Sequence, residues 1–252
     1  MTTACTTNEY FSGQGALLIG ERDSLGKPAG LREVGNVSAL SIGVETSTFE
    51  HKESCSGVRG IDLEIVQEIN VSMAMTIESM TRENLELALY GASSSVAAGS
   101  VTNEVITGYH DLWVPLANIK VSAVVVTNVA GTTTYVLGTD YLLNLDAGTI
   151  KVLSLGSITA SQTLHVDYSF ALQSDVQGVT SGTPPIKYVR FEGLNTADTN
   201  KPVIIDVYKV SFQPLATLDL ITDEITQMEI EAKVLSDALQ TGTSKYFKVR
   251  KV

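Results

Sequence analysis

Basic residues are scarce in this chain. Its 252 residues include 17 Lys and Arg against 28 Asp and Glu, so the formal net charge is −11. Tight binding to nucleic acid requires clustered basic side chains, and the chain has such a cluster only in its last few residues, from Lys245 to Lys251. The composition argues against a protein that clamps nucleic acid. It is compatible with one that lets nucleic acid pass without adhering.

Cysteines and long apolar runs are also scarce. The two cysteines, Cys5 and Cys55, are too few for a disulfide framework and predict free thiols in a reducing compartment. No apolar run approaches the ~18 residues that a membrane-spanning helix needs. The N-terminal residues lack the charged and apolar regions of a secretory signal. We therefore expect a protein that is made and kept in a cytoplasm.

Few residues are arranged for catalysis. None of the three histidines, His51, His110 and His165, has a second His or Cys at a spacing typical of metal ligands. The sequence contains no phosphate-binding loop, dinucleotide fingerprint or nucleophile elbow. We expect no catalytic, cofactor-binding or metal site, and hence not an enzyme.

Short runs rich in Val, Ile, Thr and Ser dominate the chain and predict a mainly β fold. The predicted architecture is a β-sandwich or barrel-type domain with one short flanking helix, plus an inserted small antiparallel β-module. For the last predicted strand, a helix is the competing interpretation, because Glu, Met, Ala and Lys are good helix formers. The strands predicted for the main domain are Gln14–Gly20, Val37–Val44, Ile186–Glu192, Pro202–Phe212 and Ile225–Leu235.

The segment Ile61–Glu78 has the most regular pattern. Its odd positions are nearly all apolar and its even positions nearly all polar or small, which is the period of a strand with one dry and one wet side. We predict one long, bent strand, although two strands joined by a tight turn near Gln67–Asn70 would give the same pattern. The simplest interpretation of the acidic even side is a solvated surface. A charged loop, Thr46–Gly60, is predicted before this strand.

A short amphipathic helix is predicted after the long strand. Thr81 is a suitable N-cap, and Leu85, Ala88 and Leu89 would share its apolar face. Gly91 is the expected stop.

Two small-residue linkers, Ala92–Gly99 and Gln177–Pro185, flank a region of short predicted strands. They divide the chain into a first part of the main domain (1–100), an inserted β-module (101–173) and a second part of the main domain (174–252). The strands predicted in the module are Val121–Thr127, Tyr135–Val136, Ile150–Leu153 and Leu164–Phe170.

Several of these stretches, taken in order, resemble the major tail tube proteins of long-tailed bacteriophages. In the first half they are FSGQGALLIG (Phe11–Gly20), Gly35-Asn36-Val37 with its strand, the long strand ending at Glu78, and the helix with Leu85 and Gly91. In the second half they are RFEGLN (Arg190–Asn195) and the strand containing Tyr208-Lys209-Val210. The inserted module resembles a small β-module of such proteins at Thr139–Tyr141, Ala147–Ile150 and Val166–Tyr168. The resemblance covers most of the chain.

The resemblance implies a structural subunit of the virion tail, assembled in the host cytoplasm. Subunits of that family form rings, usually hexameric, whose strands join into an inner barrel. The rings stack into a hollow tube through which DNA leaves the capsid, typically past an acidic lumen. The implied partners are further copies of the chain, the tail tip or baseplate, the tail terminator and the tape measure protein. DNA would pass without stable binding, and no membrane is involved.

Two groups of residues are assigned roles through the resemblance, and the inserted module is expected outside the tube. The lumen candidates are Asp62, Glu64, Glu68, Glu78, Glu229 and Glu231. The candidates for a loop that contacts neighbouring subunits or the adjacent ring are Thr48, Glu50, His51, Lys52, Glu53 and Arg59.

Two other functions remain open at this stage. One is the tube of a contractile injection or secretion system, which the sequence does not separate from a phage tail. The other is an adhesin-like β-sandwich that binds surfaces, which would be expected to have a secretion signal and an aromatic platform. The chain has one tryptophan, Trp113.

Overall fold

The computed structural model describes residues 9–252 and divides the chain into two compact units. Unit 1 consists of Met1–Ser93 and Val176–Val252, and unit 2 is the intervening Ser94–Asp175. The boundaries proposed from the sequence, 101 and 173, lie inside unit 2. Each unit has its own hydrophobic core.

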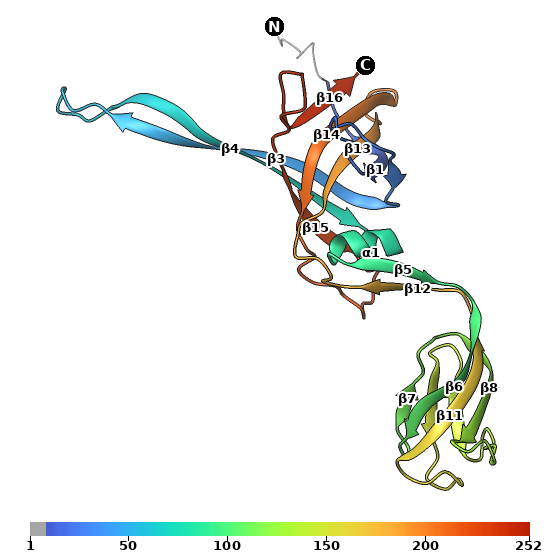
Figure 1. The fold of residues 1–252 in the computed structure, drawn as a ribbon. Coiled ribbons are helices and arrows are strands. Elements are labelled where there is room, and N and C mark those ends of the chain that lie inside the picture. Colours follow the sequence, from blue (N-terminus) through green and yellow to red (C-terminus); the bar gives the residue numbers. More distant parts are fainter. Residues whose placement is uncertain (1–8) are drawn as a thin grey trace. The chain divides into compact units, whose positions relative to one another are not determined.

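The described residues of unit 1 form mainly one antiparallel sheet with a single short helix, which confirms the mainly β fold (Figure 1). The order of the sheet is β2-β1-β13-β14-β15-β4-β3, and β16 pairs with the part of β14 that β15 leaves open. The strands are β1 (Gly13–Gly20), β2 (Arg32–Glu33), β3 (Val37–Lys52), β4 (Ile61–Ile77), β13 (Ile186–Asn195), β14 (Lys201–Phe212), β15 (Met228–Val234) and β16 (Phe247–Lys251).

The sheet does not close into a barrel. At one end of the sheet, the short β2 pairs with part of β1; at the other end lies β3. No pairing joins these two ends within residues 9–252. The described part of a single chain therefore does not form a barrel by itself. Two free strand edges are left instead, and such edges are available for pairing with another chain.

The core lies on one side of this sheet. Along β15 and the last part of β4, from Val71 to Ile77, buried residues alternate with more exposed ones, as a strand with one dry side requires. Met73, Ile77, Met228 and Ile230 are among the fully buried side chains. This alternation confirms a strand over Met228–Val234 and excludes the competing helix. The buried core also includes residues of β1, β13, β14 and the helix.

β16 is held to the sheet by a buried carboxylate. Asp206 on β14 is buried, accepts a hydrogen bond from Arg190 Nη1 at 3.0 Å on one side, and is ion-paired to Arg250 of β16 on the other. Tyr188 lies beside this carboxylate, and burial, with Asp206 as a further cause, raises the pKa of its phenol. The carboxylate thereby connects three neighbouring strands.

β3 and β4 form a longer hairpin than the sequence predicts. β4 is one continuous strand of 17 residues, so the alternative of two strands with a turn near Gln67–Asn70 is wrong. The predicted loop Thr46–Gly60 is also wrong over its first half, because Thr46–Lys52 belongs to β3 and pairs with β4. Only residues 53–60 form the turn at the tip.

The helix α1 (Arg82–Ala88) begins as expected. The hydroxyl of Thr81 accepts a hydrogen bond from the Asn84 amide, which is the arrangement of an N-cap. The buried face differs from the prediction: Leu87 and Ala88 are buried with Asn84, whereas Leu85 and Leu89 are half-buried. The buried Asn84 side-chain amide donates hydrogen bonds to the Val34 and Ser79 carbonyls, both 2.8 Å long, which offset the cost of burying a polar group.

Unit 2 is a small all-β unit with two three-stranded sheets, β7-β10-β9 and β6-β11-β8. Buried Val126, Ile150, Leu164 and Tyr168 contribute to its core. Tyr135–Val136, expected as a strand, is not part of one: the Tyr135 amide donates to the Val126 carbonyl of β8 at 2.9 Å, and the Val136 amide donates to the buried Asp140 carboxylate at 2.8 Å. The strands are β6 (Gly99–Gly108), β7 (Trp113–Pro115), β8 (Val121–Asn128), β9 (Tyr141–Asn144), β10 (Thr149–Val152) and β11 (Gln162–Phe170).

The segments that lead into and out of unit 2 are not flexible linkers over their whole length. β5 (Ala92–Val96) and β12 (Gln173–Gln177) pair as a two-stranded sheet. The predicted linker Ala92–Gly99 is therefore largely strand. The second predicted linker, Gln177–Pro185, begins at the end of β12 and is otherwise without a strand.

Candidate functional site: an exposed ribbon and an acidic sheet face

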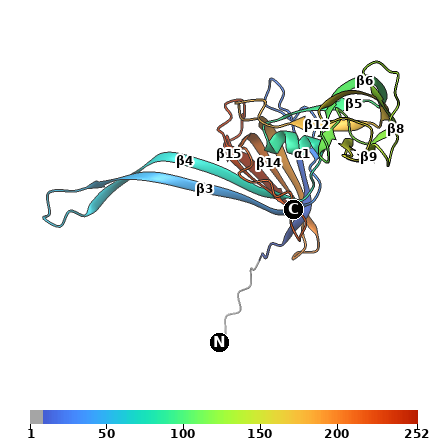
Figure 2. The same ribbon diagram turned by 90° about the horizontal axis from the view of Figure 1, so that it is seen from below.

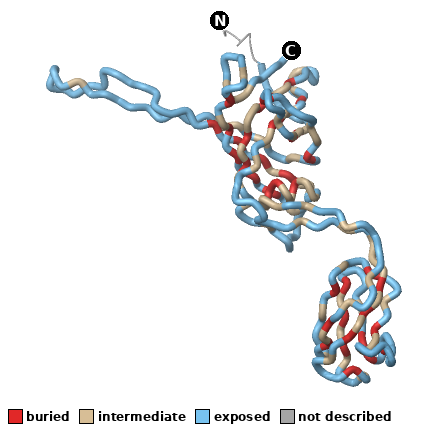
Figure 3. Tube along the Cα trace, viewed as in Figure 1, coloured by how far each residue is buried: buried red, intermediate tan, exposed pale blue. Residues whose placement is uncertain are grey.

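The outer part of the β3–β4 hairpin is a two-stranded ribbon, here called the arm, that comprises residues 44–52, the tip 53–60 and residues 61–70. It extends beyond the remainder of unit 1 and is exposed along nearly its whole length (Figures 2 and 3). Apolar side chains on it, among them Phe49, Leu63, Ile65 and Val66, are between 48% and 55% exposed. The expectation that the odd side of β4 is dry therefore holds only from Val71 to Ile77.

A register shift divides the arm into two parts with different faces. Ser47 lies opposite Glu68, but the next residue, Thr48, lies opposite Val66, so Gln67 is an extra residue in β4. Residues directly opposite each other share a face of the ribbon, and successive residues of β3 alternate between faces. From Val66 toward the tip, as far as the next register shift, the odd-numbered residues of β4 therefore lie on the same face of the ribbon as the even-numbered residues from Glu68 to Thr76.

The consequence is an apolar group near the end of the arm, on the face opposite to the core side. Phe49 lies opposite Ile65, and His51 lies opposite Leu63 on the same face. We call Phe49, Leu63 and Ile65 the apolar end group. Val66, opposite Thr48, lies on the other face.

The tip of the arm is organised by Glu53. One of its carboxylate oxygens accepts hydrogen bonds from the Cys55 amide at 2.7 Å and the Ser56 amide at 2.9 Å, and the Ser56 hydroxyl donates to the other oxygen. These hydrogen bonds, led by that of the Ser56 side chain, lower the pKa of Glu53. Cys55 is an exposed free thiol, and Cys5 lies outside the described residues.

The six residues proposed for an inter-subunit loop all lie on the arm, but four are in a strand. Thr48, Glu50, His51 and Lys52 belong to β3, whereas Glu53 and Arg59 belong to the tip. The residues in the strand lie opposite defined residues of β4, and these pairs could not be predicted from the sequence.

Two of these strand positions involve charged groups on the opposite strand. The Nδ1 atom of His51 lies 2.6 Å from Asp62 Oδ1, and Glu50 lies directly opposite Glu64. Like charges at directly opposite positions destabilise a strand pair.

A second feature is the side of β3-β4-β15 that faces away from the core, here called the outer face. Its residues on β3 and β4 are small or uncharged, from Ala39 to Gly43 and from Asn70 to Thr76. On β15, Glu229 lies opposite Thr76 and Glu231 opposite Ala74, and both are exposed. The result is a smooth sheet surface with acidic side chains at one border.

The six lumen candidates do not lie on one surface. Glu229 and Glu231 lie on the outer face, and Glu68 lies on its continuation along β3 and β4. Glu64 lies on the other face of the arm, beyond the register shift, so the even-numbered acids of the long strand do not share one face. Asp62 is the extra residue at a further register shift, between His51 and Lys52.

Glu78 follows the end of β4 and differs from the other candidates in its contacts. It is half-buried, accepts a hydrogen bond from the Asn36 amide group, and accepts a second from Gln227 at 3.3 Å. Its role in the structure is to join three segments of unit 1.

Further acids gather beside the outer face that the sequence analysis did not single out. Glu45 lies opposite Asn70 and therefore on the same side as Glu68. A hollow of about 600 Å³ beside β15 is lined by Asp219 and Glu224 together with Glu229 and Glu231. The sequence did contain a signal for Glu45, because this residue continues the alternation of the predicted strand Val37–Val44 by one position. It was missed because the predicted strand ended at Val44 and a loop was predicted to follow.

A third feature is an apolar opening between the two free edges of the sheet, here called the slot. It has a volume of about 690 Å³ and is lined by residues of β1, β3, β4, β13 and β14. Leu40 and Ile42 of β3, with Phe191 and Ile205 from the facing strands, line it and are only half-buried. The core of unit 1 is thus open to solvent at the position where a closed barrel would have its next strand.

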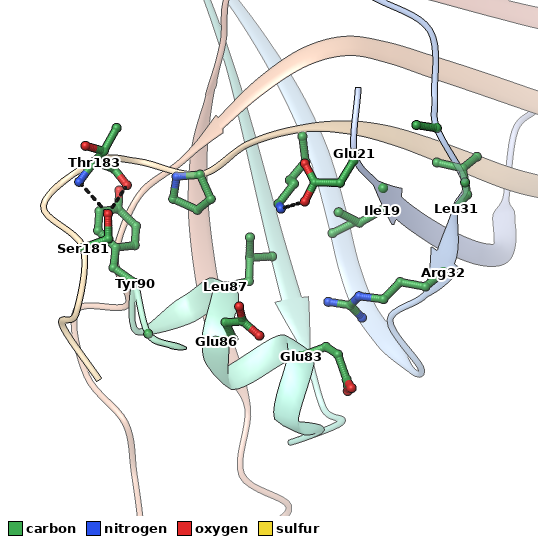
Figure 4. A pocket seen from close by; sticks show the side chains of 16 residues that line it. Ile19, Glu21, Leu31, Arg32, Glu83, Glu86, Leu87, Tyr90, Ser181 and Thr183 are labelled. Atoms are coloured by element: carbon green, nitrogen blue, oxygen red, sulfur yellow. Dashed lines mark hydrogen bonds and ion pairs between the residues drawn. The ribbon is translucent and has the colours of Figure 1, made fainter. Parts of the chain in front are cut away.

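A cavity of about 650 Å³ whose lining includes charged side chains lies beside α1 (Figure 4). Its charges are of both signs and have partners within the chain: Arg32 donates to Asn84 Oδ1 at 2.8 Å, and Lys187 is paired with Glu21. Burial lowers the pKa of the Arg32 guanidinium, an effect that Glu83 and Glu86 oppose. The cavity therefore combines charges of both signs, and its cationic side chains make hydrogen bonds or ion pairs within the chain.

Among residues 9–252, no cluster of His, Cys, Asp and Glu side chains could hold a metal ion. In the same range, no helix has the length and apolar character needed to cross a membrane.

Comparison with known proteins places the chain in a family. No curated protein matches the sequence. A family model matches residues 10–250, which include both units, nearly from end to end. The chain therefore belongs to the protein family described as Protein of unknown function UCP028589.

Proposed function

We propose that the chain is a structural subunit that assembles into rings stacked as a hollow tube, the tail tube of a long-tailed bacteriophage through which DNA is ejected. The observation that carries the proposal is the open sheet of unit 1 with its exposed arm. A strand edge and an apolar ribbon of this length are liabilities in a monomer. Both are accounted for if neighbouring copies cover them.

The outer face supports a conduit for DNA. It combines small side chains with Glu229, Glu231 and Glu68 and presents a single base, Lys233 on β15. Phosphate groups bind where Lys and Arg can displace counterions, and a mainly acidic wall offers little such binding. Repeated in each copy around a ring, these acids form circles of negative charge. Glu229, Glu231 and Glu68 are thus retained as lumen residues in this proposal, with Glu45 added.

Assembly is tested directly by electron microscopy and sedimentation velocity. The purified protein is expected to form rings or tubes as its concentration rises. A variant in which residues 45–69 are replaced by a two-residue turn should retain the fold of unit 1, because the buried part of β4 begins at Val71, and should stay monomeric. A wild-type protein that is monomeric at every concentration and salt condition would refute the proposal.

The role of the outer face is tested by charge reversal. We expect tubes of the Glu229→Lys/Glu231→Lys variant to retain added DNA at low salt and to release it as salt increases, because each phosphate contact is salt-dependent. The matched control is Asp111→Lys/Asp146→Lys, which makes the same charge change at exposed positions of unit 2. Equal DNA retention by both variants would contradict the assignment of the outer face to the lumen.

A second candidate function has one observation in its favour. On the exposed face of sheet β7-β10-β9, Lys151 lies between Trp113 and Leu142 in register, and Trp113 is half exposed. An exposed tryptophan beside a lysine is one element of the binding surface that an adhesin-like module would use. Binding of isolated unit 2 to host surface glycans, abolished by Trp113→Ala, would support this function.

A further inference from the structure

We infer that the arm of one copy docks its apolar end group, Phe49, Leu63 and Ile65, into the slot of a second copy. The inference rests on the proposed assembly and names the two surfaces that meet. Both surfaces are apolar, both are open in the single chain, and they lie on different parts of unit 1.

The arm cannot fill the slot of its own chain. Val37–Ile42 of β3 forms one wall of the slot and continues without a break into the arm. Phe49 is seven residues beyond Ile42, or ~23 Å along an extended strand. The ladder between β3 and β4 is continuous from Val37 to Lys52 apart from three register shifts, so folding the arm back would break it.

The residues before the described part fit the slot poorly. Residues 1–8 include four threonines and one asparagine, whereas the slot is lined by Leu17, Leu40, Ile42 and Phe191. An apolar slot is best filled by apolar side chains. The apolar end group of a second copy supplies one aromatic and two aliphatic side chains of this kind.

The free edges around the slot also favour a ribbon as the occupant. β3 pairs only with β4, and β1 is paired on its outer side only at Leu18 and Ile19. An entering strand can therefore hydrogen-bond to an edge while its side chains enter the apolar space, which is the mode of strand addition.

The register shift at Gln67 determines which face of the arm carries Leu63 and Ile65. Without the shift, Leu63 and Ile65 would continue the alternation of β4 and lie on the same face as Val71 and Met73, whereas Phe49 on β3 lies on the opposite face in either case. With the shift, all three side chains share the face opposite to the core side and can engage another molecule. Because arm and slot are different surfaces, the contact is head-to-tail, and repetition gives a closed ring or an open filament.

Cysteine cross-linking tests the contact directly. In a background with Cys5→Ser and Cys55→Ser, the pair Ile65→Cys/Ser38→Cys should give intermolecular disulfides, because Ser38 lies on the slot. The matched pair Val66→Cys/Ser38→Cys should not, because Val66 lies on the opposite face of the arm. Equal cross-linking by both pairs, or by neither, would overturn the inference.

Assembly of charged variants gives a second readout. Ile65→Glu should raise the concentration needed for assembly about tenfold or more, since docking would bury a charge. Val66→Glu, on the opposite face, should have a much smaller effect. Both positions are exposed, so both variants should fold. The inference also fails if Ile65→Glu assembles at the wild-type concentration.

Blocking the slot completes the test. Ser38→Trp, or Gln14→Trp if the first variant fails to fold, should prevent docking at exposed positions of the slot. A mixture of Ile65→Glu and Ser38→Trp chains should form a two-chain species that neither forms alone, because one intact arm and one intact slot remain. If wild-type tubes form but the mixture shows no such species, the arm–slot contact is refuted while the proposed function stands. A wild type that never assembles would refute both.

Discussion

Removing unit 2 should leave unit 1 folded. The two hydrophobic cores have no residue in common, and β5 and β12 pair with each other at the junction. We therefore expect that residues 97–172 can be replaced by a four-residue Gly/Ser turn joining β5 to β12. The deletion removes 172 − 96 = 76 residues and keeps both strands of the junction.

The size of the effect follows from loop closure. Each doubling of a flexible loop costs ~0.6 kcal/mol, so reducing 76 residues to four could stabilise unit 1 by at most ~2.6 kcal/mol if unit 2 were a random coil. Unit 2 is folded, so the gain should be smaller. We expect the free energy of unfolding of unit 1 to be unchanged within ~1 kcal/mol, or slightly increased.

Urea denaturation followed by circular dichroism measures this change. The slope of the free energy against urea should correspond to the smaller chain, because it scales with the surface exposed on unfolding. Residues 94–175 expressed alone should also unfold cooperatively. A deletion variant that is unfolded, or that loses several kcal/mol, would show that unit 2 contributes to the stability of unit 1 and that the division into two units is wrong.

Three further predictions concern single positions. Asp206→Asn should destabilise the protein by ~2 kcal/mol in thermal or urea unfolding, because two partly exposed arginines lose a buried charge, whereas Asp198→Asn, in an exposed pair, should cost less than ~1 kcal/mol. Ile230→Ala should cost ~3 kcal/mol by leaving a cavity in the core, whereas neighbouring Glu229→Ala should change stability by less than ~0.5 kcal/mol. The pKa of Glu53 is lowered in the folded chain, so the order of the tip is present above the unfolded-state pKa and lost as pH falls through the folded pKa. The protection factors of amide hydrogens at the tip, which correct for the intrinsic effect of pH on exchange, should therefore fall in acid, and Glu53→Gln should remove this dependence.

Much of unit 1 was predictable because periodicity reports burial. The alternation over Val71–Ile77 and Met228–Val234 identifies both strands and their core side, since each residue there meets the core or solvent in turn. Thr81 marks the helix start for a local reason, namely that its side chain caps a backbone amide. These features depend on interactions within a few residues or within one sheet face.

The β4 half of the arm was predicted as a strand, but the β3 half was missed because its strand geometry depends on pairing with β4. Thr46–Lys52 contains polar and charged residues that resemble a loop, and only its partners in β4 give it strand geometry. The extra residue Gln67 then exchanges the faces of the odd and even residues of β4 between it and the next register shift toward the tip. Nothing in the composition marks that residue. Assigning Glu64 and Glu68 to one surface failed for this reason. The slot also could not be predicted, because it results from the failure of distant edges to pair.

The energetics of the arm connect its structure to assembly. An isolated two-stranded ribbon is marginally stable in water, and in this one Glu50 faces Glu64 while apolar side chains such as Ile65 and Val66 are exposed. A partner surface would remove about half of each apolar side chain from water at ~25 cal/mol per Å² and reduce fraying. Part of that gain is offset by the entropy lost when the arm becomes ordered. The arm should therefore exchange its amide hydrogens faster than β15 in the monomer and lose that difference on assembly. Protection of Ile65 and Leu63 that is already equal to that of Ile230 before assembly would show that the ribbon is stable by itself and needs no partner.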